Sequence, residues 1–188
     1  AKARAIPLVG DARVTLDEEG GFGMATRWQF SDEEWARVRA LPDLVITAAC
    51  ISDGKLPPAV RELAAGAEAM TEGIKRYPDN ALLQYLQSLK DDALYAISRV
   101  GQDDSAAAKV ENVAEALEVM VKEIEAGLAV VRVHVSTEEF AQFGEVLFGT
   151  ARAVVERLGD GFMGGGKEKV SEREQAFVDR LAAVLAPR

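Results

Sequence analysis

Cysteine and histidine are almost absent from this chain of 188 residues, which has one of each, Cys50 and His134. A single cysteine excludes an intrachain disulfide and the zinc sites that need several cysteines. A single histidine excludes metal sites built from two or three histidines. Any Ser-His-Asp or Cys-His catalytic arrangement would therefore depend on His134 alone.

Positive charge is also scarce, because 22 lysines and arginines face 31 aspartates and glutamates and leave a net charge of -9. This balance argues against binding to nucleic acid or to an anionic membrane. No apolar run approaches the roughly 20 residues that a membrane-spanning helix needs, and no cleavable signal is visible. We therefore expect a cytoplasmic protein.

What the sequence does have is helical periodicity, which continues almost without a break from Ser31 onward. Three Ser-x-x-Glu capping boxes, at Ser31, Ser136 and Ser171, predict helix starts. Pro42 fits the first turn of a new helix, so a separate buried helix is expected from Asp43 to about Ser52. The prediction is an all-α, single-domain bundle of six to seven helices over residues 24–188. The helices start at or just after Ser31, Pro42, Pro57, Asn80, Ser105, Ser136 and Ser171.

Residues 1–23 do not share this pattern. They contain the β-branched pair Val14-Thr15 and end in a glycine-rich stretch, after which Met24 looks like a natural translation start. Two interpretations stay open. The segment is either a fused leader foreign to the natural protein or a native extended arm that docks on the bundle or on a neighbouring chain.

The stretch from Gly161 to Lys167 fits the phosphate-binding pattern G-x-x-x-x-G-K. That loop needs Ser or Thr next, to bind magnesium, and it should follow a strand. Here Glu168 stands in that place and a predicted helix precedes the loop. A plain connection between helices is therefore the favoured interpretation.

The single histidine and the single cysteine have simpler interpretations than catalysis. His134 falls at the C-terminal end of the longest predicted helix, where the helix dipole favours an imidazolium, so a capping role suffices. Cys50 lies in an apolar helix with no charged sequence neighbour and is expected to be a buried, inert thiol.

Three aromatic residues, Trp28, Phe30 and Trp35, gather around the first capping box. One interpretation is that they close the core. The other is that they form a surface for a protein partner, because tryptophan is enriched at the energetic centres of interfaces.

Acidic turns occur twice along the chain. Asp53-Gly54 is followed by a helix that bears Glu62, and Asp160-Gly161 is followed by one that bears Glu174. Asp-Gly is a good turn, and acidic residues near a helix start suit the dipole, so a structural role is sufficient. The alternative is that these four carboxylates bind a divalent cation, and no other cofactor is expected.

The apolar helix that ends in Asp53-Gly54-Lys55, with Glu62 after it, resembles tellurite-resistance TerB-like domains. The second turn and its following Val170-Ser171-Glu172 resemble them as well, so the likeness covers the helical part of the chain. It implies a compact bacterial helical module whose acidic turns engage metal. Pro57-Pro58 departs from the family, which prefers serine and acidic residues there.

The main functional expectation is a non-enzymatic, bacterial protein-binding or adaptor domain, with a metal-responsive TerB-like module as the alternative. A hydrolase or transferase with paired carboxylates is disfavoured, because acidic residues on helices usually form solvated surface. A homodimer is a further expectation, supported by the stripe of the longest helix and by the small residues Gly66 and Gly73.

Overall fold

The computed structural model describes residues 27–54, 60–89, 112–158 and 170–186, and the predicted arm at 1–23 lies outside these ranges. Within them all regular secondary structure is helical, which confirms the all-α prediction. Among these residues no helix is both long and apolar enough to cross a membrane. The helices are α2 (Asp32–Ile51), α3 (Val60–Lys75), α4 (Ala81–Ser88), α6 (Val113–His134), α7 (Thr137–Leu158) and α8 (Glu172–Leu185).

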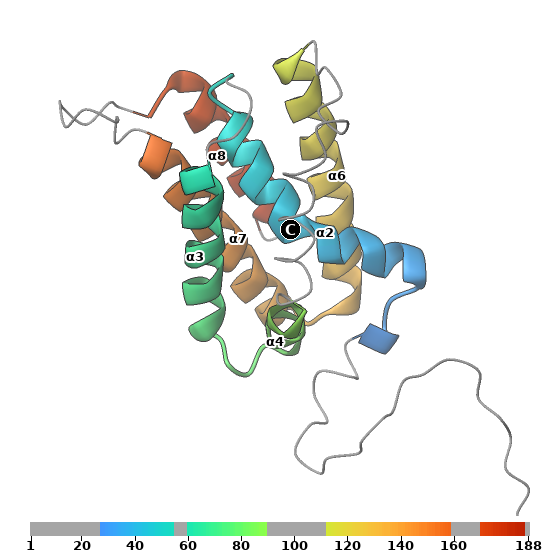
Figure 1. The fold of residues 1–188 in the computed structure, drawn as a ribbon. Helices are drawn as coiled ribbons and strands as arrows, with labels where there is room; N and C mark the ends of the chain where they lie inside the picture. The colour runs from blue at the N-terminus through green and yellow to red at the C-terminus, as the bar shows by residue number, and fades with distance from the viewer. Residues whose placement is uncertain (1–26, 55–59, 90–111, 159–169, 187–188) are drawn as a thin grey trace, which may run out of the picture.

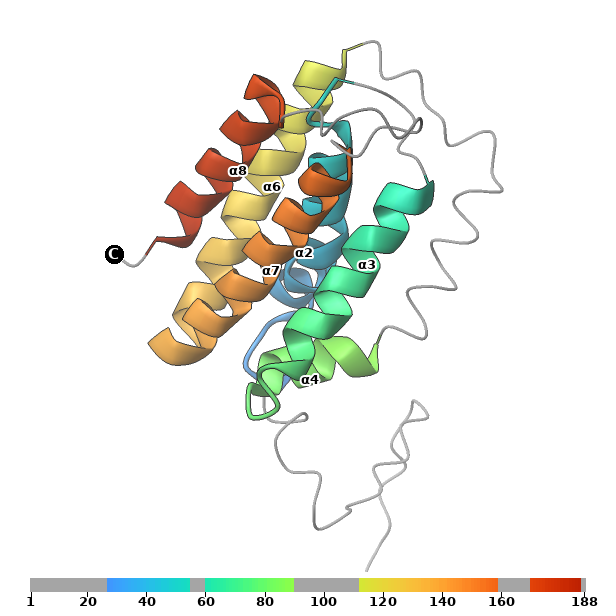
Figure 2. The same ribbon diagram turned by 90° about the vertical axis from the view of Figure 1, so that its left-hand side faces the viewer.

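The helices form a bundle in which segments distant in sequence lie side by side (Figures 1 and 2). Helix α2 packs along α6, α3 packs along α7, and α2 also contacts α7 at the centre. Helix α8 covers α6 and α7 on one side, and the short α4 lies across the end of α3. The N-terminal end of α2 and the C-terminal end of α6 therefore meet at one end of the molecule.

All three capping boxes are present, so the predicted starts of α2, α7 and α8 are confirmed. Ser31 accepts a hydrogen bond from the Glu34 amide, and the Glu34 carboxylate accepts one from the Ser31 amide. The same exchange links Ser136 with Glu139, and Ser171 with its third following residue. Each box satisfies amide groups that a helix start would leave unpaired.

The predicted break at Pro42 is wrong, because α2 continues through it from Asp32 to Ile51. Proline has no amide hydrogen, so the carbonyl of Val38 loses its usual helical donor, and such a site bends a helix without having to end it. Figure 1 shows this helix changing direction part-way along. Val38, Leu41 and Val45 are all fully buried around the proline, and their shared packing explains why the helix continues.

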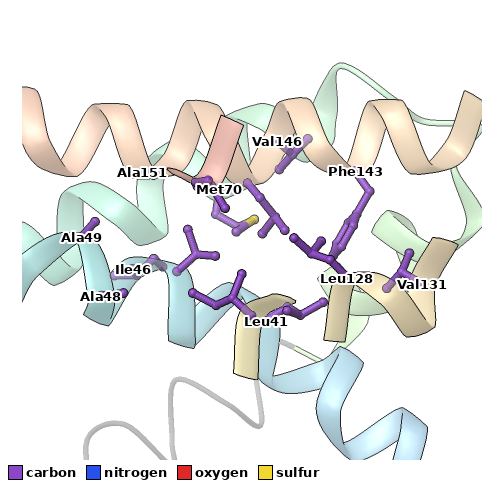
Figure 3. Close-up of a cluster of buried hydrophobic side chains, with 14 of the residues drawn as sticks. Leu41, Ile46, Ala48, Ala49, Met70, Leu128, Val131, Phe143, Val146 and Ala151 are labelled. Atoms are coloured by element: carbon purple, nitrogen blue, oxygen red, sulfur yellow. The ribbon is translucent and has the colours of Figure 1, made fainter. Parts of the chain in front are cut away.

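The core fills the space between α2, α3, α6 and α7 (Figure 3). Leu41, Met70, Leu128 and Phe143 come from these four helices and point toward one another. Each is at most 2% exposed. The core therefore uses apolar helix faces, as helical periodicity predicts, and the later part of the helix expected from Asn80, residues 90–100, lies outside the described residues.

The small residues of α3 serve contacts within the chain. A β-carbon placed on Gly66 would lie 2.8 Å from Cγ2 of Ile46, and one placed on Gly73 would lie 3.0 Å from Cγ1 of Val146. Both glycines are buried. They allow close approach of α3 to α2 and α7, so the suggestion that they form a homodimer face is not supported by their position.

Candidate functional site

The short turn before α2 holds the most exposed aromatic side chain among the described residues. Trp28 is 77% exposed. Its neighbour Arg27 donates a 2.9 Å hydrogen bond from Nη1 to the carbonyl of Phe30 and pairs with the carboxylate of Asp32. The same guanidinium lies 5.6 Å from the centre of the Trp35 ring. Trp28 is thus an exposed ring on an anchored turn.

The other two aromatic residues of the predicted surface belong to the core. Phe30 is 4% exposed and Trp35 is 8% exposed. Their ring centres lie 5.8 Å apart, and Trp35 also packs against Tyr85 of α4 at 5.1 Å. The predicted three-residue surface is therefore divided: the buried pair supports the turn, and Trp28 alone presents an aromatic ring to solvent.

His134 joins the end of α6 to the start of α2. Its ring centre lies 4.7 Å from that of Phe30, and its Nε2 lies 3.3 Å from Oε1 of Glu34. The hydrogen bonds from Ser31, first from its amide and then from its hydroxyl, together with the contact to His134, lower the pKa of Glu34 to about 2. His134 thus has a structural partner on another helix, beyond the simple capping role that its position suggested.

A shallow hollow of about 460 Å³ lies beside this contact, between the first turns of α2 and the last turns of α6. We call it the α2–α6 hollow. Its polar walls come from α2 and its apolar wall from α6, and its lining residues are Ser31, Glu33, Glu34, Arg37 and Val130. Val133, 80% exposed, lies one residue before His134 at the same end of the molecule. Sequence reasoning missed this hollow, because its two walls lie about a hundred residues apart and no local pattern marks them.

The predicted cation site is only partly assembled within the described residues. Asp53 is half-buried and Glu62 is buried. Burial is the main cause that raises the pKa of the Cys50 thiol to about 12, and the charges of Glu62 and Asp53 add to it. The thiol is 2% exposed, so the prediction of a buried cysteine is confirmed, and its inertness stays a prediction.

Of the remaining two predicted ligands, Glu174 alone lies within the described residues. Glu174 is buried, and its carboxylate accepts a 2.6 Å hydrogen bond from the Ser171 amide in its own capping box. Asp160 and the glycine-rich stretch from Gly161 to Lys167 lie outside the described residues. Among those described, no three His, Cys, Asp or Glu side chains are grouped closely enough to hold a metal ion.

A larger hollow of about 570 Å³ lies at the opposite end of α2, between α6 and α8. Leu117, Val121 and Phe177 contribute apolar walls, and Arg180 contributes a charged one. Nη1 of Arg180 lies 2.6 Å from Oε2 of Glu118, and its Nε lies 3.1 Å from Oε1 of Glu125. The guanidinium of Arg180 therefore pairs with two glutamates of α6 and links α8 to that helix.

Comparison with known proteins adds no relative to this description. The TerB-like resemblance therefore stays a prediction that rests on its short motifs. No protein-family model, no curated protein and no solved structure matches this chain.

Proposed function

We propose that this protein is a non-enzymatic protein-binding or adaptor domain whose contact surface is centred on Trp28. The observation that carries the proposal is the 77% exposure of this indole on a turn whose neighbours on both sides are held in place. A tryptophan that is exposed in the free protein becomes strongly stabilising when a partner covers it.

The contacts that hold the Trp28 turn affect a partner's binding affinity as well as the position of the indole. Arg27 is tied to Phe30 and Asp32, and Phe30 is buried against His134. A partner that covers Trp28 would therefore bind a preformed turn and would not need to order it first, which lowers the entropic cost of association. Val133, next to His134 in the sequence, is a second exposed apolar residue at the same end of the bundle.

The test compares two exposed apolar residues. Val119 on α6 is 56% exposed and carries none of the anchoring contacts of the Trp28 turn, so Val119→Ala is a control for general loss of surface hydrophobicity. We expect the wild-type protein and the Val119→Ala variant to retain the same protein from a lysate of the source organism. The Trp28→Ala variant should retain at least tenfold less, as for loss of an interface centre. Equal retention by both variants would contradict the proposal.

We also propose, as the alternative function, a metal-responsive module that binds a divalent cation at Asp53, Glu62, Asp160 and Glu174. The supporting observation is that Asp53 and Glu62, from different helical regions, act on the same Cys50 thiol. Two of the four predicted ligands therefore act electrostatically on one common group.

Thermal unfolding in EDTA, and then with calcium, magnesium, manganese or zinc, tests this alternative. A cation that binds the native state adds about 2.7 kcal/mol at a hundredfold excess over its dissociation constant. The gain should disappear in Asp53→Asn and Asp160→Asn and persist in Glu156→Gln, which removes an exposed carboxylate on α7. A flat response to every cation would exclude the site.

A further inference from the structure

One side of α6 stays accessible to solvent along most of the helix. Helix α6 packs against α2, and α7 and α8 also contact it. The side turned toward these helices holds the buried residues of α6. On the other side, six exposed or half-buried residues lie three or four positions apart, a spacing that places them on one face of a helix. We call this set the outer face of α6: Ala116, Val119, Lys122, Glu123, Ala126 and Ala129.

Most of the outer face is apolar and low in profile. Val119 is 56% exposed, Ala129 is exposed, and the alanines at 116 and 126 are half-buried. Short side chains allow a second helix to approach closely, because the distance between packed helices depends on the side chains at the contact. A β-branched valine has few rotamers to lose when it is covered.

The two charged residues at the centre of the outer face have bonding capacity to spare. Nζ of Lys122 lies 3.8 Å from Oε1 of Glu118, which is beyond hydrogen-bond distance. Glu118 is already bonded by Arg180 at 2.6 Å. Glu123 makes no hydrogen bond or ion pair with any residue that the structure describes. An ammonium and a carboxylate are therefore both available to another molecule.

The acidic residues along the edge of the outer face are compensated within the chain. Glu118 and Glu125 both pair with Arg180 of α8. This pairing reduces the negative charge that they present to an approaching molecule. The accessible charges at the centre of the face are thus one cation and one anion, side by side.

The order of residues along the outer face is symmetric about its centre. Three positions outward from Lys122 or from Glu123 comes an apolar residue, and three positions further comes an alanine. A two-fold axis between Lys122 and Glu123 would therefore place like positions of two antiparallel helices opposite one another. Lys122 would face the partner's Glu123, Val119 the partner's Ala126, and Ala116 the partner's Ala129. A contact of this kind uses the same patch on both molecules, as a two-fold dimer requires.

We propose that the outer face of α6 binds a second copy of this chain, through an antiparallel contact with two Lys122–Glu123 ion pairs at its centre. Charge complementarity selects this occupant, since the axis that pairs the charges also pairs the apolar residues. The contact covers residues 116–129, about 20 Å of helix, so the dimer is expected to be weak and reversible. The inference goes beyond the proposed function and does not depend on it, because it involves α6 alone.

Sedimentation velocity of the full chain over a series of concentrations tests the dimer. The series should run from about 5 to about 500 µM, which brackets the dissociation constants of weak complexes. We expect a reversible shift from monomer to dimer within this range. Trp28→Ala should leave the dissociation constant unchanged, because the Trp28 turn lies outside the outer face.

Charge reversal at the centre tests the symmetric pairing itself. Lys122→Glu places glutamates opposite glutamates, and Glu123→Lys places lysines opposite lysines, so each single variant should weaken the dimer by roughly tenfold or more. The double variant, Lys122→Glu with Glu123→Lys, restores both ion pairs and should recover the wild-type dissociation constant to within about threefold. An equimolar mixture of the two single variants should associate for the same reason.

A matched control separates this pairing from net charge. Lys75→Glu on α3 changes the charge of the chain by the same amount as Lys122→Glu and also removes an exposed lysine that lies near a glutamate of its own helix. It should leave the dimer unchanged. The inference is overturned by a chain that stays monomeric throughout the series, by a double variant that does not recover, by equal loss in Lys75→Glu, or by a dimer that Trp28→Ala abolishes.

Discussion

Nε2 of His134 lies 3.3 Å from Oε1 of Glu34, and this contact joins the last turn of α6 to the first turn of α2. Glu34 is at the same time the carboxylate of a capping box, since it accepts a hydrogen bond from the Ser31 amide. One side chain thus fixes the start of its own helix and the position of a neighbouring helix. The turn that carries Trp28 enters the bundle at this point.

The double role of Glu34 predicts a specific dependence of stability on pH. Its pKa falls from 4.5 to about 2 in the folded protein. A depressed folded pKa contributes stability that is present above about 4.5 and is lost as the pH falls toward 2. Glu34→Gln should therefore lower the thermal midpoint at pH 6, and the difference from wild type should shrink across this window. A difference that stays constant from pH 6 to pH 2.5 would contradict the assignment.

The unequal exposure of the two tryptophans predicts two populations in fluorescence quenching. Trp28 is 77% exposed and Trp35 is 8% exposed, so acrylamide should quench the first strongly and the second weakly. Trp28→Phe should leave only the weakly quenched, blue-shifted emission and should change stability by less than about 0.5 kcal/mol, as expected for an exposed position. Strong quenching in this variant would show that Trp35 is accessible.

Two helical glycines should respond in opposite ways to the same substitution. A β-carbon on Gly66 would lie 2.8 Å from Cγ2 of Ile46, whereas one on Gly149 would have no neighbour within 4 Å. We expect Gly149→Ala to stabilise the protein by about 0.5–1 kcal/mol through helix propensity. Gly66→Ala should destabilise it by about 1–2 kcal/mol, because overpacking outweighs that gain. Urea denaturation measures both, and a stabilised Gly66→Ala would mean that α2 and α3 are more loosely packed.

The two ion pairs of Arg180 should contribute modestly to the free energy of unfolding. Its guanidinium bonds Glu118 and Glu125, and all three side chains are more than a third exposed. Solvent screening limits such pairs, so a double-mutant cycle of Arg180→Met with Glu118→Gln should give a coupling energy of about 0.5–1 kcal/mol. The coupling should fall when salt is raised. A coupling above about 2 kcal/mol would require a much drier contact than the structure shows.

Local signals in the sequence predicted the helical architecture well. Ser31, Ser136 and Ser171 marked helix starts because capping chemistry involves residues only three positions apart. The helix break predicted at Pro42 was wrong because the proline's local preference for a helix start was outweighed by long-range packing of the residues around it. In the same way, Gly66 is a close-packing position, and only the folded chain shows that its neighbour is Ile46 and not a second copy.

The candidate site was harder to predict for a related physical reason. A cluster of aromatic residues in sequence does not show which ring faces solvent, since the contacts that bury Phe30 and Trp35 come from His134 and Tyr85. The sequence predicted an aromatic surface of three residues, and in the structure Trp28 is the exposed one of the three.

The bend in α2 lies between the two candidate surfaces, the Trp28 turn and the Asp53-Gly54 turn. The helix has 20 residues and is therefore about 30 Å long. The Trp28 turn precedes one end, the Asp53-Gly54 turn follows the other, and Pro42 lies near the middle. The proline removes one hydrogen bond of the helix there, and the helix bends at a point where its neighbours are fully buried. The angle of this bend therefore sets the direction in which the Trp28 turn leaves the bundle relative to the Asp53-Gly54 turn.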